Sequence, residues 1–261
     1  MDKTVKRIAN EIENKNPIGI FGDYDVDGAT SAAMLKLFLQ YFGIEVHIHI
    51  PDRFLEGYGP NISALNSLVS KGSNLIITVD CGINSHEPLK ELNKTDIDCI
   101  IIDHHTPDDD LPPAFSIVNP KRKENGIEYH YLSAVGVTFI MIVGLTRELR
   151  QRGVFEKIKE PNLFRFLDLV ALGTVCDVVP LKGLNRCFVK AGLNIISQRK
   201  NLGINALCDI SDLNKIPDEE TLGYKLGPKI NAAGRIGSSD IGVSLLISKD
   251  NNKANELASK L

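Results

Sequence analysis

The chain has 261 residues, of which 43% are hydrophobic and 24% are charged, and its formal net charge is −3. These values are ordinary for a soluble globular protein with a sizeable core. The slightly negative charge excludes a general electrostatic case for nucleic-acid binding, although bound divalent cations would reverse the sign locally.

The first half of the chain alternates strand-like and helix-like segments. Short, near-continuous apolar runs predict strands, and longer runs that end at Gly43 or Gly72 predict helices. This alternation predicts an α/β fold with a parallel sheet that is flanked by helices on both faces. The predicted elements are strand Ile18–Phe21, helix Ala29–Phe42, strand Val46–Ile50, helix Pro60–Lys71, strand Leu75–Val79, helix Glu87–Asn93 and strand Cys99–Ile102.

From Leu132 onward the pattern changes to helices, so we expect an α/β core over about 1–130 and a mainly helical part over about 131–261. Residues Asn251–Leu261 resemble the start of a helix that stops at the chain end, which favours a fragment of a longer protein. The predicted helices of this part are Leu132–Arg150, Leu163–Gly173, Arg186–Ser197 and Asp240–Ile247.

The five cysteines form no CxxC pair and suggest no disulfide framework, which favours reduced thiols. No apolar run reaches the length of a membrane span, and the N-terminus lacks the apolar core of a signal peptide. We therefore expect a cytoplasmic protein that does not bind a membrane.

Three acidic residues alternate directly after the first predicted strand. Asp23, Asp25 and Asp27 precede Gly28 and superficially resemble a calcium-binding EF-hand loop, but the twelfth loop position holds Met34 instead of glutamate. A phosphate-binding glycine loop is also a poor match, because three carboxylates would repel a nucleotide. A helix cap would explain one aspartate but not three. The run therefore predicts a divalent-metal site with Asp25 and Asp27 as ligands.

Other ligand-type residues also follow predicted strands. Asp80 follows the third strand, and His104 follows the fourth. A single aspartate after a strand is commonly a helix cap. However, open parallel sheets bind ligands at the carboxyl edge, where all these residues should meet.

The run Asp103-His104-His105 offers adjacent side chains that cannot all point the same way. One histidine can bind a metal while its neighbour faces substrate, and the aspartate can orient an imidazole. Asp177 stands alone in an apolar run, where it is either a helix-end cap or a metal ligand. Oxygen-rich sites with one imidazole favour Mn²⁺ over Zn²⁺, with Mg²⁺ as a substitute.

Three further features carry weaker signals. His47 and His49 share one face of a predicted strand, which favours a structural role. The segment Gly227–Arg235 combines glycines with Lys, Asn and Arg donors, and we predict a loop that recognises phosphate oxygens. A similar loop that contains Arg53 follows the second strand, although such loops are also frequent surface turns.

Four runs, taken in order, resemble the motifs of the DHH phosphoesterase superfamily. The first run and the segment Gly227–Arg235 resemble in particular the RecJ-like exonucleases of bacteria, which digest single-stranded DNA in the 5′→3′ direction. Asn119-Pro120 and the residues from Arg53 to Gly59 also fit, and the resemblance extends from about Pro17 to the chain end. The four runs are residues 22–28, 79–82, 103–105 and 173–177.

The resemblance implies a metal-dependent exonuclease of DNA repair and recombination, with single-stranded DNA as substrate and a single-strand-binding protein or a helicase as partner. It implies two Mn²⁺ or Mg²⁺ ions, with Asp80 bridging them. His105 would face the scissile phosphate, with Asp103 beside it, and Arg53, Asn231 and Arg235 would bind nucleic-acid phosphates. The implied metal ligands are Asp25, Asp27, Asp80, His104 and Asp177.

The chain departs from the family pattern in two respects. RecJ-like proteins continue into a DHH-associated domain and often an OB-fold, and this chain contains neither. We therefore expect the N-terminal catalytic fragment of such a protein, with weak DNA binding on its own. The second departure is Leu184-Asn185-Arg186, which stands where the family usually has Glu-Asn-Arg and has no interpretation from sequence.

Two other functions remain open. One is a DHH phosphodiesterase that acts on short oligonucleotides or cyclic dinucleotides. The other is an inactive replication scaffold related to RecJ, although the intact set of acids and histidines argues against it. An inorganic pyrophosphatase of the superfamily would begin its first motif with a histidine, where this chain has Phe21.

Overall fold

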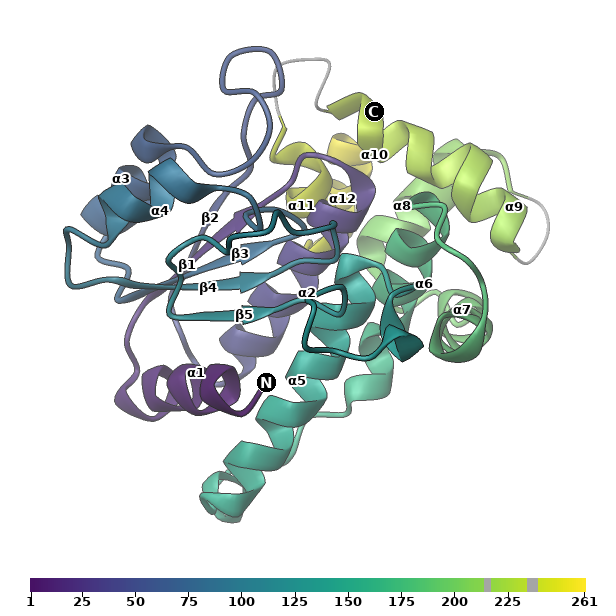
Figure 1. Ribbon diagram of the computed structural model, residues 1–261. Coiled ribbons are helices and arrows are strands. Elements are labelled where there is room, and N and C mark those ends of the chain that lie inside the picture. Colours follow the sequence, from purple (N-terminus) through teal and green to yellow (C-terminus); the bar gives the residue numbers. More distant parts are fainter. Residues whose placement is uncertain (214–216, 234–238) are drawn as a thin grey trace.

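The computed structural model of the chain describes residues 1–213, 217–233 and 239–261. Five parallel strands form one sheet in the order β2-β1-β3-β4-β5 (Figure 1). The chain runs from β1 to one neighbour, β2, and then crosses back to the other, β3, so the strand order reverses between β1 and β3. The strands are β1 (Ile18–Gly22), β2 (Val46–His49), β3 (Leu75–Val79), β4 (Asp98–Ile102) and β5 (Ser116–Val118).

Both faces of the sheet are covered, and alternate strand residues enter different cores. Ile20 and Ile77 belong to a large core on the face covered by α1, α2 and α5, whereas Phe21 and Ile76 belong to a smaller core under α3 and α4. This arrangement confirms the prediction from the near-continuous apolar strands. The helices are α1 (Asp2–Asn14), α2 (Val26–Tyr41), α3 (Ile62–Ser70), α4 (His86–Leu92) and α5 (Ala134–Gln151).

Short helices after α5 build the second part of the molecule, on the right in Figure 1. None of the helices in the described part of the chain is long and apolar enough to cross a membrane. The longer elements of this part are α6 (Leu167–Cys176), α7 (Gly183–Ile196), α8 (Leu202–Ile210), α10 (Gly227–Ala233), α11 (Ile241–Leu246) and α12 (Asn251–Ala258). The shorter ones are η1 (Ile127–Tyr129), η2 (Val154–Glu156), η3 (Leu163–Phe166), α9 (Glu219–Thr221) and η4 (Leu222–Leu226).

Helix α2 joins the two parts. Small residues such as Ala29, Ala32 and Ala33 are buried on it, and it contacts the sheet as well as α5, α6 and α11. A helix that is apolar on all sides requires such complete burial. As a result, the N-terminus of α2 lies between the strand ends and the helical part.

Most predicted elements agree with the structure to within a few residues. Helices α1 and α8 and strand β5 were not predicted, and the predicted helix over Leu163–Gly173 is divided into η3 and a longer α6. The predicted loop over Gly227–Arg235 is wrong for its first seven residues, which form helix α10. Pro228 is the second residue of α10, and the first turn of a helix tolerates proline because its amides have no partner within the helix.

Candidate metal centre

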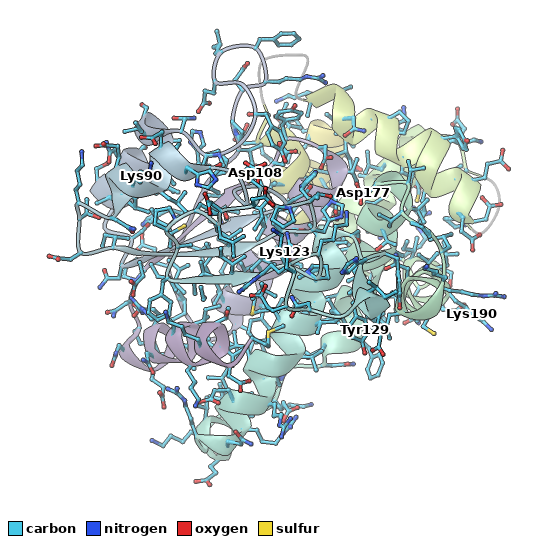
Figure 2. All side chains as sticks on the ribbon, viewed as in Figure 1. Lys90, Asp108, Lys123, Tyr129, Asp177 and Lys190 are labelled. Carbon is cyan, nitrogen blue, oxygen red and sulfur yellow. The ribbon has the colours of Figure 1, made fainter. Side chains whose placement is uncertain are left out.

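Acidic and imidazole side chains converge at the carboxyl ends of the strands. Asp23 and Asp25 follow β1, Asp80 follows β3 and His104 follows β4, so they surround the point where the strand order reverses. Ligands of open α/β sheets bind at such points. Asp177, labelled in Figure 2, comes from the end of α6 and lies 3.6 Å (Oδ2) from His104 Nδ1.

Among the residues that the structure describes, three overlapping groups of side chains could each hold a metal ion. Each group places one potential ligand atom per residue within 4.8 Å of the others. Asp80 belongs to two groups, and so does His104. The groups are Asp23 with Asp25 and Asp80, Asp80 with His104 and His105, and Asp27 with His104 and Asp177. The structure therefore brings all five predicted metal ligands together and adds Asp23.

His104 is arranged as a neutral metal ligand. Its Nδ1 lies 3.1 Å from the carbonyl oxygen of Leu132, to which it donates, so Nε2 carries the lone pair. Burial and the neighbouring charge of His105 lower the pKa of His104 to about 4, which keeps the ring neutral. Nε2 is buried without a hydrogen bond and lies 3.4 Å from Asp80 Oδ1, which also has no hydrogen-bond partner.

His105 has the opposite character, although it is the next residue. Its Nδ1 donates to Asp103 Oδ1 at 2.8 Å, and this hydrogen bond raises the pKa of His105. The His105 side chain is 44% exposed, and when the ring is protonated its second nitrogen can donate to an anion. Asp103 is fully buried and accepts the amides of His104, His105 and Ile83. Asp103 thus positions both histidines and offers no free oxygen to a substrate.

Asp27 is held by the helical part of the chain. Its two carboxylate oxygens accept the amides of Ala134 and Val135, at 2.6 and 2.9 Å, at the N-terminus of α5. Helix N-termini stabilise negative charge. Asp177 lies instead at the C-terminus of α6, where a carboxylate is unfavourable, and its buried Oδ2 has no hydrogen bond. The helix-cap interpretation of Asp177 therefore does not account for its position.

The acids of the centre repel one another in the absence of cations. Burial and the charge of Asp25 raise the pKa of both Asp23 and Asp177 to about 7, and burial with the charge of other acids raises the pKa of Asp80 and Asp27 well above the ordinary value. Asp80 also has a left-handed backbone (φ 61°), a conformation that few residue types other than glycine, asparagine and aspartate adopt. The repulsion between buried acids and the buried ligand atoms without partners together fit a site built for divalent cations.

Of the three predicted substrate-binding residues, two lie within the described part of the chain. Arg53 is exposed, and its guanidinium lies 5.4 Å from the ring centre of Tyr24, beside Asp23 and Asp25. Asn231 is exposed on α10, which contacts α2 and α6. Arg235 lies outside the described residues, so its position stays a prediction.

The sequence analysis assigned no role to two residues that touch His105. The Tyr58 hydroxyl lies 3.4 Å from His105 Nδ1, and Asn119 Nδ2 donates to the His105 carbonyl at 2.9 Å. The motifs around both residues were visible in the sequence. However, β5, which places Asn119 next to β4, is too short to be recognised by its pattern.

Two further residues have structural roles. His49 lies on Phe21, with 5.4 Å between ring centres, and contacts Glu56 at 2.8 Å, so it supports the loop that carries Arg53. Asn185 is fully buried and donates to the carbonyls of Tyr131 and Pro180, which fixes the turn after Asp177.

Comparison with known proteins identifies related sequences and folds. The single-stranded-DNA-specific exonuclease RecJ of Haemophilus influenzae is 38% identical over 99% of this chain and 45% of its own length. RecJ of Escherichia coli is also 38% identical, over 100% of this chain and 46% of its own length. The chain thus spans about half the length of these curated relatives.

A crystal structure of exonuclease RecJ bound to manganese has a TM-score of 0.86 and 32% identity, covering 99% of this chain and 63% of that one. RecJ of Thermus thermophilus in complex with Mn²⁺ has a TM-score of 0.81 and 29% identity, covering 99% of this chain and 36% of that one. Residues 17–174 match the N-terminal domain of the DHH family. The chain therefore belongs to the DHH family.

Proposed function

We propose that this chain is the catalytic part of a metal-dependent exonuclease that hydrolyses the phosphodiester bonds of single-stranded DNA. The observation that carries the proposal is the set of buried, unpartnered donor atoms at the strand ends, namely Asp80 Oδ1, His104 Nε2 and Asp177 Oδ2. Buried polar atoms are rarely left without a partner unless an ion or ligand completes the site. The RecJ relatives support DNA as the substrate.

The donor set suits two Mn²⁺ ions, with Mg²⁺ as the alternative, because it is rich in carboxylates and contains one neutral imidazole. Bound ions would activate water and neutralise the charge that develops on the phosphate. Asp80, which belongs to two of the three donor groups, is the candidate bridging ligand. The proposed ligands are Asp25, Asp27, Asp80, His104 and Asp177.

The remaining site residues act on the substrate or on each other. His105, whose pKa is raised by its hydrogen bond to Asp103, donates a hydrogen bond to the phosphate at the reacting centre when its ring is protonated. Arg53, Asn231 and Arg235 bind phosphates of the strand. We assign the 5′→3′ polarity by similarity to the RecJ-like exonucleases.

We further propose that residues 1–261 form a catalytic unit within a longer protein, with an α/β core over about 1–130 and a helical part over about 131–261. The length of the RecJ relatives supports this arrangement. Single-stranded DNA is the proposed partner, with a single-strand-binding protein or a helicase supplying it in repair and recombination. A DNA substrate favours action in the cytoplasm.

The test is release of nucleotides from a labelled single-stranded oligonucleotide in Mn²⁺. Asp80→Asn keeps the shape of the side chain, and asparagine tolerates the left-handed backbone. We expect release to fall more than about a hundredfold, beyond the effect of residues that only support metal ligands. The exposed Asp110→Asn is the matched control. Full activity of Asp80→Asn would disprove the assignment.

Two controls separate the alternatives. Faster hydrolysis of a dinucleotide than of a long strand would favour a phosphodiesterase of short substrates. A calorimetric titration in which the chain takes up no Mn²⁺ would favour the inactive scaffold.

A further inference from the structure

The loop after β5 is tied to the metal centre by a short chain of hydrogen bonds. Asn119 Nδ2 donates to the carbonyl of His105 at 2.9 Å, and Asn119 Oδ1 accepts the amide of Lys121 at 2.7 Å. Asn125 Nδ2 donates to the Asn119 carbonyl at 2.7 Å and closes the loop. Because both ends are anchored, the backbone of Lys121 has a fixed position relative to His105.

This loop contains three consecutive cations, of which two have acidic partners. Arg122 forms an ion pair with Glu124, and Lys123, labelled in Figure 2, pairs with Asp109 at 2.8 Å. Lys123 is also 77% exposed, as expected for an ordinary surface lysine. Lys121 is half-buried, and within the described ranges no carboxylate lies within 4.0 Å of its ammonium group.

The charge of Lys121 nevertheless acts on the metal centre. Burial and Asp25 raise the pKa of Asp177 to about 7, and the charges of His105 and Lys121 oppose this rise. Burial and His105 lower the pKa of His104 to about 4, and Lys121 acts in the same direction. Asp177 and His104 belong to the same donor group, together with Asp27. The hydrogen bonds through Asn119 place the backbone of Lys121 beside His105, at the edge of the same centre.

We propose that Lys121 binds a phosphate oxygen of the single strand beside His105, at the edge of the centre. This inference rests on the proposed function. A lysine that only compensated the acids would pair with one of them, and Lys121 does not. Once cations occupy the donor groups, the carboxylates no longer attract the ammonium group, and a phosphodiester is the anion that remains to bind it. A flexible ammonium with three donors suits such a contact.

The test compares Lys121→Met with the matched control Lys123→Met from the same loop. Binding of a phosphorothioate oligothymidylate, which resists hydrolysis, is measured in Mn²⁺ over a range of salt concentrations. We expect Lys121→Met to weaken binding about tenfold and to reduce the slope of log K against log salt by about 0.7, the value for one phosphate contact on a single strand. Lys121→Arg should restore most of the affinity, and Lys123→Met should resemble the wild type.

Calorimetric titration of the same variants with Mn²⁺ distinguishes DNA contact from support of the ligands. We expect Lys121→Met to bind Mn²⁺ within about twofold of the wild type. An unchanged salt slope overturns the inference, whether Mn²⁺ affinity changes or not. If Asp80→Asn abolishes nucleotide release while Lys121→Met keeps the wild-type slope, only this inference fails. A wild-type chain that neither releases nucleotides nor binds the oligonucleotide refutes both proposals.

Discussion

Replacing Asp23 by asparagine should stabilise the metal-free chain at neutral and alkaline pH. Asp23 is 4% exposed, and burial together with the charge of Asp25 raises its pKa from 3.8 to about 7. Because the pKa is higher in the folded state, ionisation destabilises the fold, and the penalty grows as the pH rises from 3.8 through 7. Linkage between these two pKa values gives a penalty of about 1.7 kcal/mol at pH 5 and about 4 kcal/mol at pH 8.

Urea unfolding in EDTA, between about pH 5 and pH 8, measures this effect. The amide side chain introduced by Asp23→Asn keeps an oxygen that can accept the amide of Tyr24, a hydrogen bond of 2.8 Å in the wild type, so the substitution removes charge and little else. The gain in unfolding free energy should increase with pH and shrink when Mn²⁺ is added, because cations offset the charge of Asp25. The exposed Asp110→Asn serves as the control. A gain that is independent of pH, or a loss of stability at pH 8, would refute this account.

Two further substitutions test how the surroundings position the site. Gly173→Ala would place a Cβ atom 2.3 Å from Thr30 Oγ1 and 3.0 Å from Asp27 Oδ1. We expect a loss of about 1–3 kcal/mol in urea unfolding and weaker Mn²⁺ binding by calorimetry, and wild-type Mn²⁺ affinity would contradict the close fit. Glu56→Gln weakens the contact with His49 and should raise KM for single-stranded DNA about fivefold with little change in kcat. A fall in kcat of about fivefold, in place of the rise in KM, would argue against a role of Glu56 in holding the loop that carries Arg53.

The position of the site was predictable because parallel strands share an edge. Asp25, Asp80 and His104 each follow an apolar run, and the order of the runs places these residues together without any knowledge of side-chain packing. Asp177 is different. The contact between Asp177 and His104 depends on how α6 packs against α2, and no local sequence pattern encodes this packing.

The elements that were missed have weak local patterns. Helix α1 is rich in polar and charged residues, and its buried face depends on contact with α5 and β5. β5 has only three residues. In the segment from Gly227, glycine and proline favoured a loop, yet a Cβ at Gly227 would approach Cys176 Sγ to 2.5 Å. Glycine therefore serves close packing of this helix against α6 rather than flexibility.

The opposite characters of the two neighbouring histidines also require tertiary structure. The residues themselves offer two equivalent rings, which only the family resemblance told apart, and the physical difference comes from their partners. The Leu132 carbonyl accepts from His104 and leaves its Nε2 free for a cation, whereas Asp103 accepts from His105 and raises the pKa of that ring. The first partner lies in the helical part, and the second lies at the end of β4.

The segment from Leu132 to Val135 thus connects the two parts of the chain chemically as well as physically. The carbonyl of Leu132 fixes the tautomer of His104. The amides of Ala134 and Val135 donate to the two carboxylate oxygens of Asp27. One turn of backbone, at the start of α5, therefore orients a ligand from β4 and a ligand from α2. The α/β core supplies most of the potential metal-ligand atoms, but the helical part supplies the backbone groups that orient two of these ligands. A metal centre with this donor arrangement consequently needs both parts of the chain.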